Sequence, residues 1–412
     1  MLTRVPVQPR DIEAYRPIVG DEVVDDLRSR AKDLAGARVL HINSTAYGGG
    51  VAEILYTLVP LMSSLGLEAE WQIIEAEPEF FEVTKFFHNA LQGMEIPTTR
   101  QMTDTYMRTI RENAFHFAGE YDFVIVHDPQ PCAMLGILEE MGERNGNWIW
   151  RCHIDTTVAQ EDAWGFLLPY INNYDAAVFT KDDYIKTPLE VRRVAFIPPS
   201  IDPLSPKNQT PSEQMTDEIV RGYGVDRERP ILLQVSRFDP WKDPLGVVDT
   251  YRMVKQEYPR TQLVFLASMA GDDPEGWHYY EKTNKYKGDD PDIHLLSNLQ
   301  GVGNLEVSAF QAAAAVVLQK SLREGFGLTV TEAMWKNKPV VAGRVGGIML
   351  QIEDGVDGFL VDDIQQAAEK TNELLGDPQC CGGIGEAAHR KVLEHFLSTR
   401  HVGDYLDLFH AL

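Results

Sequence analysis

Cysteine is scarce in this chain, with four among 412 residues. Cys132, Cys152, Cys380 and Cys381 fit no metal-binding spacing, and two adjacent cysteines are poor partners for a disulfide bond. Few cysteines without a disulfide pattern are typical of a reducing compartment. We therefore expect a cytoplasmic protein without a metal site.

Long hydrophobic runs are lacking as well. No apolar run reaches the roughly 18 residues that a membrane helix needs. The first residues, Met1–Val7, show no basic region followed by an apolar core, so we expect no signal peptide. A membrane partner is not expected.

Positive charge is in short supply, with 38 Lys and Arg residues against 62 Asp and Glu residues and a formal net charge of −24. Such a surface repels nucleic acid and anionic lipid, so we expect neither as a partner. It also repels a nucleotide diphosphate at long range. A phosphate site in this chain must therefore be built locally from placed cations and backbone amides.

The chain does contain a regular alternation of short apolar runs with helical patterns, which is typical of βα units and parallel sheets. The runs expected to be strands are Arg38–Ile42, Glu70–Ile74, Phe123–Val126, Trp148–Cys152, Ala177–Phe179, Val194–Ile197, Ile231–Val235, Leu263–Ala267, Ile293–Leu296, Ala315–Leu318 and Pro339–Ala342. Helical patterns include Val51–Leu65, Leu245–Tyr258 and Val402–Leu412.

A proline-rich segment divides the chain near its middle. Four prolines crowd Ile197–Pro206, which predicts a stiff linker rather than the interior of an element. Residues 1–200 and 201–395 each hold enough strands for one open, doubly wound sheet with its own core. The terminal helix within residues 396–412 is a candidate to pack back on the first domain.

Two cations follow the predicted strand Ile231–Val235. Arg237 can hold two oxygens at once, and Lys242 adds a point charge five residues later. A leaving diphosphate gains negative charge in the transition state, and two cations beside it lower that barrier. The alternative is a pair of surface cations that neutralise Asp239 and Asp243.

The stretch Arg323–Glu332 is the most informative part of the chain. It places Glu324 and Glu332 eight residues apart around the glycine-flanked Phe326. A helix is predicted from Leu328, so free amides and the positive end of the helix dipole would point at the loop, which suits a phosphate. Glu332 can accept hydrogen bonds from ribose hydroxyls, and Glu324 can bind sugar hydroxyls. The alternative is a capped helix with solvated acids.

Polar residues also follow three predicted strands of the first half, at the sheet edge where open α/β proteins bind ligands. Gly48-Gly49-Gly50 follow the first strand, His127-Asp128 end the third, and His153 and Asp155 end the fourth. The glycines lack the Gly-x-Gly-x-x-Gly spacing of a dinucleotide site, so they predict either close approach of a ligand or a tight turn.

The histidines leave alternatives open. A histidine at a strand end can contact a transferred sugar, or it can be a hydrogen-bonded structural residue. A zinc site from His127, Asp128, His153 and Asp155 is conceivable on residue type, but no pair has helical spacing and no cysteine joins them.

Taken together, these motifs resemble those of a known group. The chain is similar to the retaining, two-domain nucleotide-sugar glycosyltransferases of the GT-B fold, the group of glycogen and sucrose synthases. It shares their Glu-x7-Glu motif, Glu324 to Glu332, and their Arg/Lys pair, Arg237 and Lys242. Within that group it most resembles the glycosyl-transferring trehalose synthase family. The segments that carry this nearer likeness are Asn43–Glu53, Val126–Pro131, Trp150–Asp155, Val235–Lys242 and Asp272–Trp277.

The resemblance implies two doubly wound Rossmann-like domains facing across a cleft. The N-terminal domain would bind the acceptor and the C-terminal domain the nucleotide sugar. The implied reaction moves glucose from a nucleoside diphosphate glucose, ADP- or UDP-glucose, to free glucose with retention, giving α,α-trehalose and the nucleoside diphosphate. No cofactor is required, magnesium at most stimulates, and a homodimer is expected. The alternatives are a retaining trehalose phosphorylase, which is usually a longer chain, and a related transferase with another acceptor.

The resemblance also assigns roles to residues. Arg237 and Lys242 would stabilise the diphosphate, and Glu324 and His153 would contact the donor glucose. Further donor contacts are expected from Gly49, Gly50, Ser236, Asn298, Gly325, Phe326, Gly327, Leu328, Thr329 and Glu332. Acceptor contacts are expected from Tyr47, Gly48, Asp128, Gln130 and Asp155.

Overall fold

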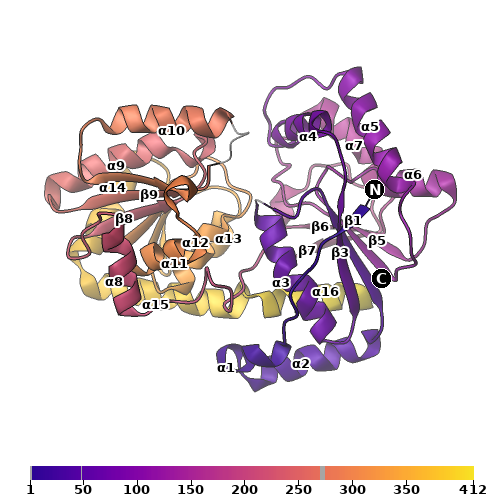
Figure 1. Ribbon diagram of the computed structural model, residues 1–412, viewed down its shortest axis with the longest axis horizontal. Helices are drawn as coiled ribbons and strands as arrows, with labels where there is room; N and C mark the ends of the chain where they lie inside the picture. Colours follow the sequence, from indigo (N-terminus) through magenta and orange to yellow (C-terminus); the bar gives the residue numbers. More distant parts are fainter. Residues whose placement is uncertain (1, 48, 270–273) are drawn as a thin grey trace. The chain divides into compact units, whose positions relative to one another are not determined.

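The computed structural model describes residues 2–47, 49–269 and 274–412. The chain divides into two compact units, which are described separately. Unit 1 comprises Met1–Ser200 and Ser398–Leu412, and unit 2 comprises Ile201–Leu397. In each unit, helices lie on both faces of a central sheet (Figure 1). Of the segment Asp272–Trp277, the first two residues lie outside the described ranges.

Unit 1 is built on a seven-stranded sheet in the order β1-β3-β2-β4-β5-β6-β7. All neighbours are parallel except β1, which pairs antiparallel with β3. The strands are β1 (Leu2–Arg4), β2 (Arg38–Asn43), β3 (Glu68–Ile74), β4 (Phe123–His127), β5 (Asn147–Arg151), β6 (Ala176–Phe179) and β7 (Arg193–Phe196).

The helices of unit 1 follow the strands in βα order, and the last one comes from the end of the chain. They are α1 (Arg16–Val19), α2 (Asp21–Ala31), α3 (Gly50–Ser64), α4 (Pro78–Leu91), α5 (Arg100–Ala114), α6 (Met134–Met141), α7 (Glu161–Ile171) and α16 (Ser398–His410). Helix α16 packs within this unit: Phe409 stacks on Phe123 at a centroid distance of 4.2 Å, and Asp407 pairs with Arg30 at 3.0 Å.

Unit 2 is built on a six-stranded, fully parallel sheet in the order β10-β9-β8-β11-β12-β13. Its strands are β8 (Ile231–Val235), β9 (Gln262–Ala267), β10 (Ile293–Ser297), β11 (Val316–Gln319), β12 (Val340–Gly343) and β13 (Phe359–Val361). Its helices are α8 (Glu213–Gly222), α9 (Pro244–Glu257), α10 (Pro274–Lys287), α11 (Asn304–Ala313), α12 (Leu328–Trp335), α13 (Ile348–Gln351), α14 (Ile364–Gly376) and α15 (Pro378–His395).

Every predicted strand is confirmed, with ends that differ by two residues at most. The apolar runs are buried from end to end in β4, β6, β8 and β9, as expected for parallel strands covered on both faces. Two strands were not predicted, β1 and β13. Each is only three residues long, too short for a hydrophobic period.

Each unit has its own apolar core. In unit 1 the large buried side chains Trp148, Trp150 and Trp164 pack with Tyr106 and Phe87 against one face of the sheet. In unit 2 a second cluster surrounds Phe265, Tyr251 and Val341. Burial of this kind is the main source of stability, at roughly 25 cal/mol per Å² of apolar area.

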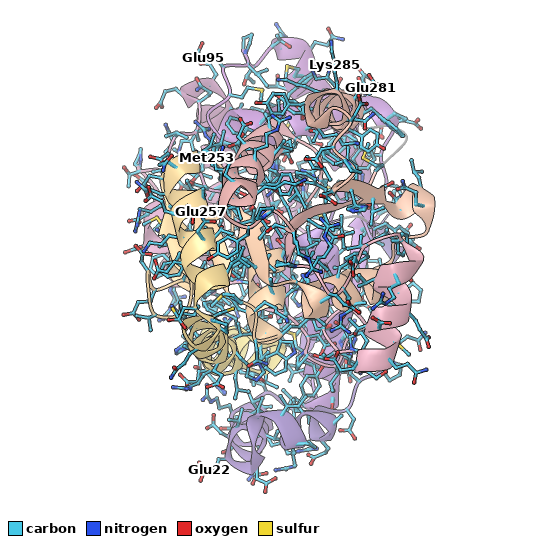
Figure 2. All side chains as sticks on the ribbon, turned by 90° about the vertical axis from the view of Figure 1, so that its left-hand side faces the viewer. Glu22, Glu95, Met253, Glu257, Glu281 and Lys285 are labelled. Atoms are coloured by element: carbon cyan, nitrogen blue, oxygen red, sulfur yellow. The ribbon has the colours of Figure 1, made fainter. Side chains whose placement is uncertain are left out.

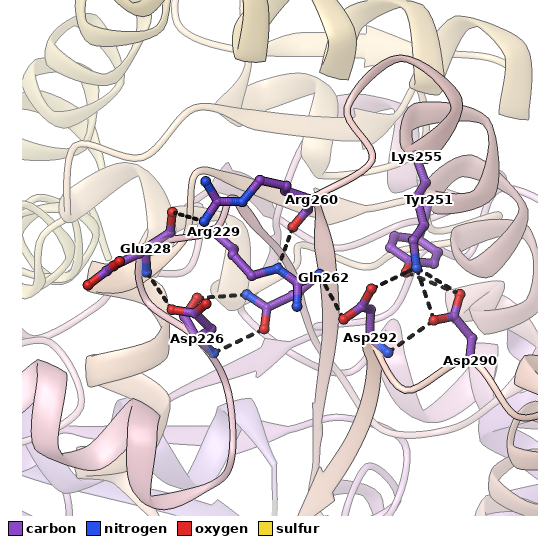
Figure 3. A network of polar contacts seen from close by, with 9 residues as sticks. All are labelled: Asp226, Glu228, Arg229, Tyr251, Lys255, Arg260, Gln262, Asp290 and Asp292. Atoms are coloured by element: carbon purple, nitrogen blue, oxygen red, sulfur yellow. Dashed lines mark hydrogen bonds and ion pairs between the residues drawn. The ribbon is translucent and has the colours of Figure 1, made fainter.

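A charged network occupies the edge of the unit 2 sheet where the strands begin (Figure 3). Lys255 pairs with Asp290 at 3.0 Å and with Asp292 at 2.8 Å, while Arg229 pairs with Asp292 at 2.7 Å. Burial lowers the pKa of Lys255, but hydrogen bonds to Asp292, Tyr251 and Asp290 outweigh it and raise that pKa. Since ligands of open sheets bind at the opposite, carboxyl edge, we interpret this network as structural.

Several acidic side chains project from the helices. Glu22 on α2 and Glu281 on α10 project outward from their helices, and Lys285 follows Glu281 one turn later (Figure 2). Among the described residues, no helix has the length and apolar character that a membrane crossing requires.

Candidate active-site residues of the two units

The topology marks one position in each sheet where a ligand is expected. Chain connections reverse direction between β8 and β11 in unit 2 and between β2 and β4 in unit 1. Loops after the carboxyl ends of two such strands diverge and leave room for a ligand. The loops that follow these strands carry most of the residues singled out from the sequence.

In unit 2 the structure brings Lys242 and Glu324 into contact, although 82 residues separate them. The Lys242 ammonium forms an ion pair with Glu324 Oε2, and the two side chains are 17% and 11% exposed. Ser321 Oγ donates to the same oxygen at 3.1 Å. The predicted cation after β8 and the predicted carboxylate after β11 therefore meet at the switch point.

Arg237 differs from Lys242 in its exposure. Its side chain is 68% exposed, and it faces Asp239 Oδ2 at 3.8 Å. Asp239 is buried; burial raises its pKa, although Lys242 and Arg237 oppose that effect. Asp239 Oδ1 accepts a hydrogen bond from the Lys242 amide at 3.1 Å, which holds the turn between the two cations. Arg237 thus extends into solvent from a fixed turn.

The loop before α12 has a conformation that its glycines permit. Gly327 has φ +85°, a left-handed value that side chains disfavour. Gly347 donates its amide to Glu324 O at 3.2 Å, and a Cβ on Gly347 would lie 2.4 Å from Gly325 O. Gln351, fully buried, donates to Phe326 O and accepts from Thr331 Oγ1. These contacts fix the backbone that carries Glu324.

Helix α12 begins at Leu328, as predicted, so its first amides face this loop. Thr329 Oγ1 donates to Gln319 Oε1 at 3.3 Å. Ser236 Oγ accepts from Gln234 Nε2 at 3.0 Å. The residues predicted to contact a donor from this part of the chain thus belong to loops after β8 and β11 and to the start of α12.

Glu332 occupies a different environment from the one its predicted role suggests. Its side chain is fully buried. Lys207 Nζ lies 2.6 Å from one carboxylate oxygen, and Gln311 Nε2 donates to the other at 3.2 Å. Lys336 donates to Gln311 Oε1 and to Lys207 O, both at 2.9 Å. A ribose at this carboxylate would share it with Lys207 and Gln311 or replace one of them.

Asn298, predicted as a donor contact, uses its side chain within the protein. Its Oδ1 accepts from the Met269 amide at 2.7 Å, and its Nδ2 donates to Met269 O at 3.0 Å. The side chain therefore holds the segment after β9 in place. The second N–H of Nδ2 and the second lone pair of Oδ1 are not used by these two bonds.

In unit 1, Asp128 links the ends of β4 and β5. It has a positive φ of 64°, and its Oδ1 accepts from the His153 amide at 2.8 Å. Burial raises the pKa of Asp128 to about 6, although that hydrogen bond and Arg151 oppose the shift. Asp128 and His153, which were singled out separately, are thus direct neighbours.

Three histidines of unit 1 form a chain. His41 Nδ1 lies 3.0 Å from His127 Nε2, and His127 Nδ1 lies 3.1 Å from His153 Nε2. His41 and His127 are buried, whereas His153 is partly exposed. Among the described residues no group of three or more His, Cys, Asp or Glu side chains has a geometry that holds a metal ion.

The remaining predicted acceptor residues vary in setting. Tyr47 is 80% exposed, and its amide is hydrogen-bonded to Thr45 Oγ1 at 3.1 Å. Asp155 Oδ1 accepts from the Thr157 amide at 3.0 Å, which stabilises its own turn. Gln130 is partly buried. Gly48 lies outside the described residues.

The two glycines that follow are exposed at the start of a helix. Gly49, with φ 142°, precedes α3, and Gly50 begins it. The amides of this first turn therefore point toward the loop after β2.

Several residues that shape these sites were not predicted. Ser321 and Gln319 bond to Glu324, Lys320 pairs with Asp243 at 2.5 Å, and Gln351 fixes the α12 loop. The sequence offered one signal for Lys320 and Ser321, namely their position directly after the strand β11. No pattern pointed to Gln351, because its partners, Thr331 Oγ1 and the carbonyl groups of Phe326 and Gly327, are 20 to 25 residues away.

Comparisons with known proteins cover nearly the whole chain. Residues 41–186 match the family described as "Trehalose synthase, N-terminal domain", and residues 215–391 match "Glycosyl transferases group 1". The chain is 51% identical to a trehalose synthase of Rubrobacter xylanophilus, covering 100% of this chain and 99% of that protein. It is 46% identical to a trehalose synthase of Thermococcus litoralis, with the same coverage.

More distant relatives share the fold or part of the length. A trehalose phosphorylase of Grifola frondosa is 26% identical over 93% of this chain but only 58% of that protein. Among solved structures, an α,α-trehalose-phosphate synthase (UDP-forming) of Burkholderia xenovorans in complex with glucose-6-phosphate superposes with a TM-score of 0.71. That match has 14% identity and covers 91% of this chain and 100% of the other.

Proposed function

Since this chain belongs to the trehalose synthase family, whose members are glycosyltransferases with the GT-B fold, we propose that it transfers glucose from a nucleoside diphosphate glucose to free glucose. The products are α,α-trehalose and the nucleoside diphosphate, and the anomeric configuration is retained. ADP-glucose and UDP-glucose are the donors we expect.

The observation that carries this proposal is the contact between Lys242 and Glu324 at the switch point of unit 2. In the free protein each is the partner of the other. With a donor bound, Lys242 would face the diphosphate and Glu324 the glucose hydroxyls, so one ligand would satisfy both charges. Such a pair suits a ligand that is anionic at one end and carries hydroxyls at the other.

Arg237 completes the proposed donor site. Departure of the diphosphate concentrates negative charge on its oxygens, and preorganised cations stabilise that charge in the transition state. Arg237 is mostly exposed and so can reach the phosphates. Two cations with the amides of α12 supply this stabilisation without a metal, and we expect magnesium at most to stimulate.

We assign the acceptor glucose to unit 1, near Tyr47, Asp128, Gln130 and Asp155, and we assign His153 to the transferred glucose. Retaining glycosidases use a carboxylate nucleophile on the protein. Here the acceptor hydroxyl attacks from the side that the diphosphate leaves, with a diphosphate oxygen taking its proton. Glu324 then binds the sugar and forms no bond to it.

The likeness to a trehalose phosphorylase defines the alternative, in which inorganic phosphate replaces the nucleotide. One assay separates the two. The protein is incubated with trehalose and either ADP, UDP or inorganic phosphate, and the sugar products are identified by mass spectrometry. We expect a nucleoside diphosphate glucose and glucose. Glucose 1-phosphate formed only with phosphate would refute the proposal in favour of the phosphorylase. We also expect a homodimer, which sedimentation measures directly.

A further inference from the structure

A layer of polar side chains lies on one buried face of the unit 1 sheet. His41 on β2 is in register with Ile125 on β4, and His127 on β4 is in register with Arg151 on β5. Registered residues of neighbouring strands share a face, as do residues two apart on one strand. His41, His127 and Arg151 therefore lie on the same side, opposite the face that carries Trp148 and Trp150.

The histidines of this layer are joined end to end. Their rings are nearly coplanar, with angles of 25° between His41 and His127 and 15° between His127 and His153. In the two pairs the contacting nitrogens are 3.0 and 3.1 Å apart, and they lie between ring centroids that are 5.3 and 5.4 Å apart. Each N–H therefore points at the lone pair of the next ring. Two in-plane hydrogen bonds thus connect the sheet interior to the partly exposed His153.

The three linked histidines can place their protons in few ways. A neutral imidazole carries one N–H and one lone pair, so a bond through one nitrogen fixes the role of the other. Burial lowers the pKa of all three rings, to about 3 for His41, which keeps them neutral. The three tautomers are therefore coupled. Either every ring carries its proton on Nδ1, or every ring carries it on Nε2.

The two arrangements differ at His41 and His153, the first and last of the three linked histidines. With protons on Nε2, the unused N–H is on His41 Nε2, which is buried and has no hydrogen-bond partner among the described residues. With protons on Nδ1, the unused N–H is on the partly exposed His153, where an oxygen can accept it. Buried N–H groups without an acceptor are rare in folded proteins, and lone pairs without a donor are less so.

We infer that His41 and His127 are positioning residues that hold His153 in the tautomer with its proton on Nδ1. His153 is then a fixed hydrogen-bond donor toward its exposed side. Its Nδ1 has no lone pair with which to accept a proton, and its Nε2 is occupied by His127. His153 therefore binds an oxygen rather than acting as a general base. That this oxygen belongs to the transferred glucose rests on the proposed function.

The tautomers can be measured directly by NMR on the free protein. The full-length chain is labelled with 15N-histidine, and long-range 1H–15N spectra at pH 7.5 distinguish protonated from unprotonated ring nitrogens. Signals are assigned by their loss in His41→Gln, His127→Gln and His153→Gln. We expect a protonated Nδ1 and an unprotonated Nε2 for all three rings of the wild type. A protonated Nε2 on His153 would overturn the inference.

A variant tests whether the hydrogen bonds among the three histidines determine the tautomer of His153. His41→Phe keeps an aromatic ring but removes the first donor, so we expect His153 to gain a population with its proton on Nε2. The control is His116→Phe. His116 is exposed and is not one of the three linked histidines, so this substitution should leave the His153 spectrum unchanged. A His153 spectrum that is identical in wild type and His41→Phe would exclude a role for His41. No substrate is present, so a failure here is distinct from a failure of the proposed activity.

Discussion

At the scale of single residues, the ligand-free protein already pairs the charges that we propose a donor binds. Lys242 and Glu324 neutralise each other where the loops after β8 and β11 meet, while Arg237 remains largely exposed. A site built this way keeps its carboxylate and its cation in position without a ligand. In the proposed function, donor binding exchanges one set of charged partners for another.

Removal of the charge of Arg237 or of Glu324 should reduce turnover far more than it reduces the stability of the fold. We expect Arg237→Ala and Glu324→Ala each to lower turnover by roughly 10²-fold or more, the scale of one lost transition-state contact. Steady-state kinetics with saturating donor and glucose measure this. Arg100→Ala, at a side chain that is 94% exposed, is the control and should keep full turnover. Near-normal turnover in either site variant would remove that residue from the site.

Asp128 offers a pH-dependent test. Burial raises its pKa from 3.8 to about 6, so the folded state binds the proton more tightly than the unfolded state. This contribution to stability is present at low pH and is lost as pH rises between those values. Asp128→Asn cannot ionise, keeps the acceptor for the His153 amide and tolerates a positive φ. At pH 7.5 we expect it to be more stable than wild type by up to about 3 kcal/mol, the free energy equivalent of a pKa difference of about two units.

Urea unfolding at two pH values provides the measurement. The advantage of Asp128→Asn should be present at pH 7.5 and shrink toward zero near about pH 3, where the wild-type carboxyl is mostly protonated in both states. An equal difference at both values would show that the effect does not come from the titration of Asp128.

The positions of most candidate site residues could be predicted, because the ends of strands can be recognised in the sequence. Arg237, Asp128 and His153 each lie within two residues of the end of an apolar run that proved to be a strand. Their partners were not predictable in the same way. The contacts of Glu332 with Lys207 and of Asn298 with Met269 depend on tertiary packing, which no local period encodes.

At the scale of elements, the α12 loop depends on close backbone approach. A Cβ on Gly347 would lie 2.4 Å from Gly325 O and 2.7 Å from Phe326 Cα, and neither backbone atom can move without displacing Glu324. We expect Gly347→Ala to lower the free energy of unfolding by about 1–3 kcal/mol. Turnover should fall in the fraction that stays folded, because the carboxylate shifts.

A matched glycine serves as the control for this element. Gly382 lies inside α15, and a Cβ there would meet nothing within 4 Å. Gly382→Ala should keep turnover and raise stability by roughly 0.5–1 kcal/mol, the helix propensity difference. If both alanine variants behave alike in urea unfolding and in turnover, the close approach at Gly347 is not important.

The elements themselves were largely predictable for a physical reason. Strands buried on both faces must be continuously apolar, so β4, β8 and β9 are evident as runs of hydrophobic residues. β1 is short, lies at the edge of its sheet and has exposed residues, so its sequence carries little hydrophobic pattern. The sequence predicted doubly wound sheets, but it did not predict the strand order, which is β10-β9-β8-β11-β12-β13 in unit 2.

At the scale of the whole molecule, the dominant feature is the net charge of −24. Repulsion among the excess acidic groups opposes the folded state, and salt screens it over about 10 Å at 0.1 M. We expect the thermal midpoint to rise by roughly 2–4 °C between 20 mM and 500 mM NaCl, equivalent to about 1 kcal/mol. Differential scanning calorimetry measures this. A midpoint that falls would mean that attractive ion pairs outweigh the repulsion.

The whole molecule also has two sheets with separate cores and a set of polar residues at the carboxyl edge of each. This division suits a reaction with two sugar substrates, of which one carries a diphosphate. The proposed assignment gives the donor to unit 2, which has Arg237 and Lys242, and the acceptor to unit 1.

The identity of the product tests this assignment most directly. The protein is incubated with 13C-labelled glucose and, in separate samples, unlabelled ADP-, UDP- or GDP-glucose, and the disaccharide is identified by NMR. We predict α,α-trehalose with one labelled and one unlabelled ring, together with the free nucleoside diphosphate. No trehalose with any donor, or a different disaccharide, would contradict the proposed function.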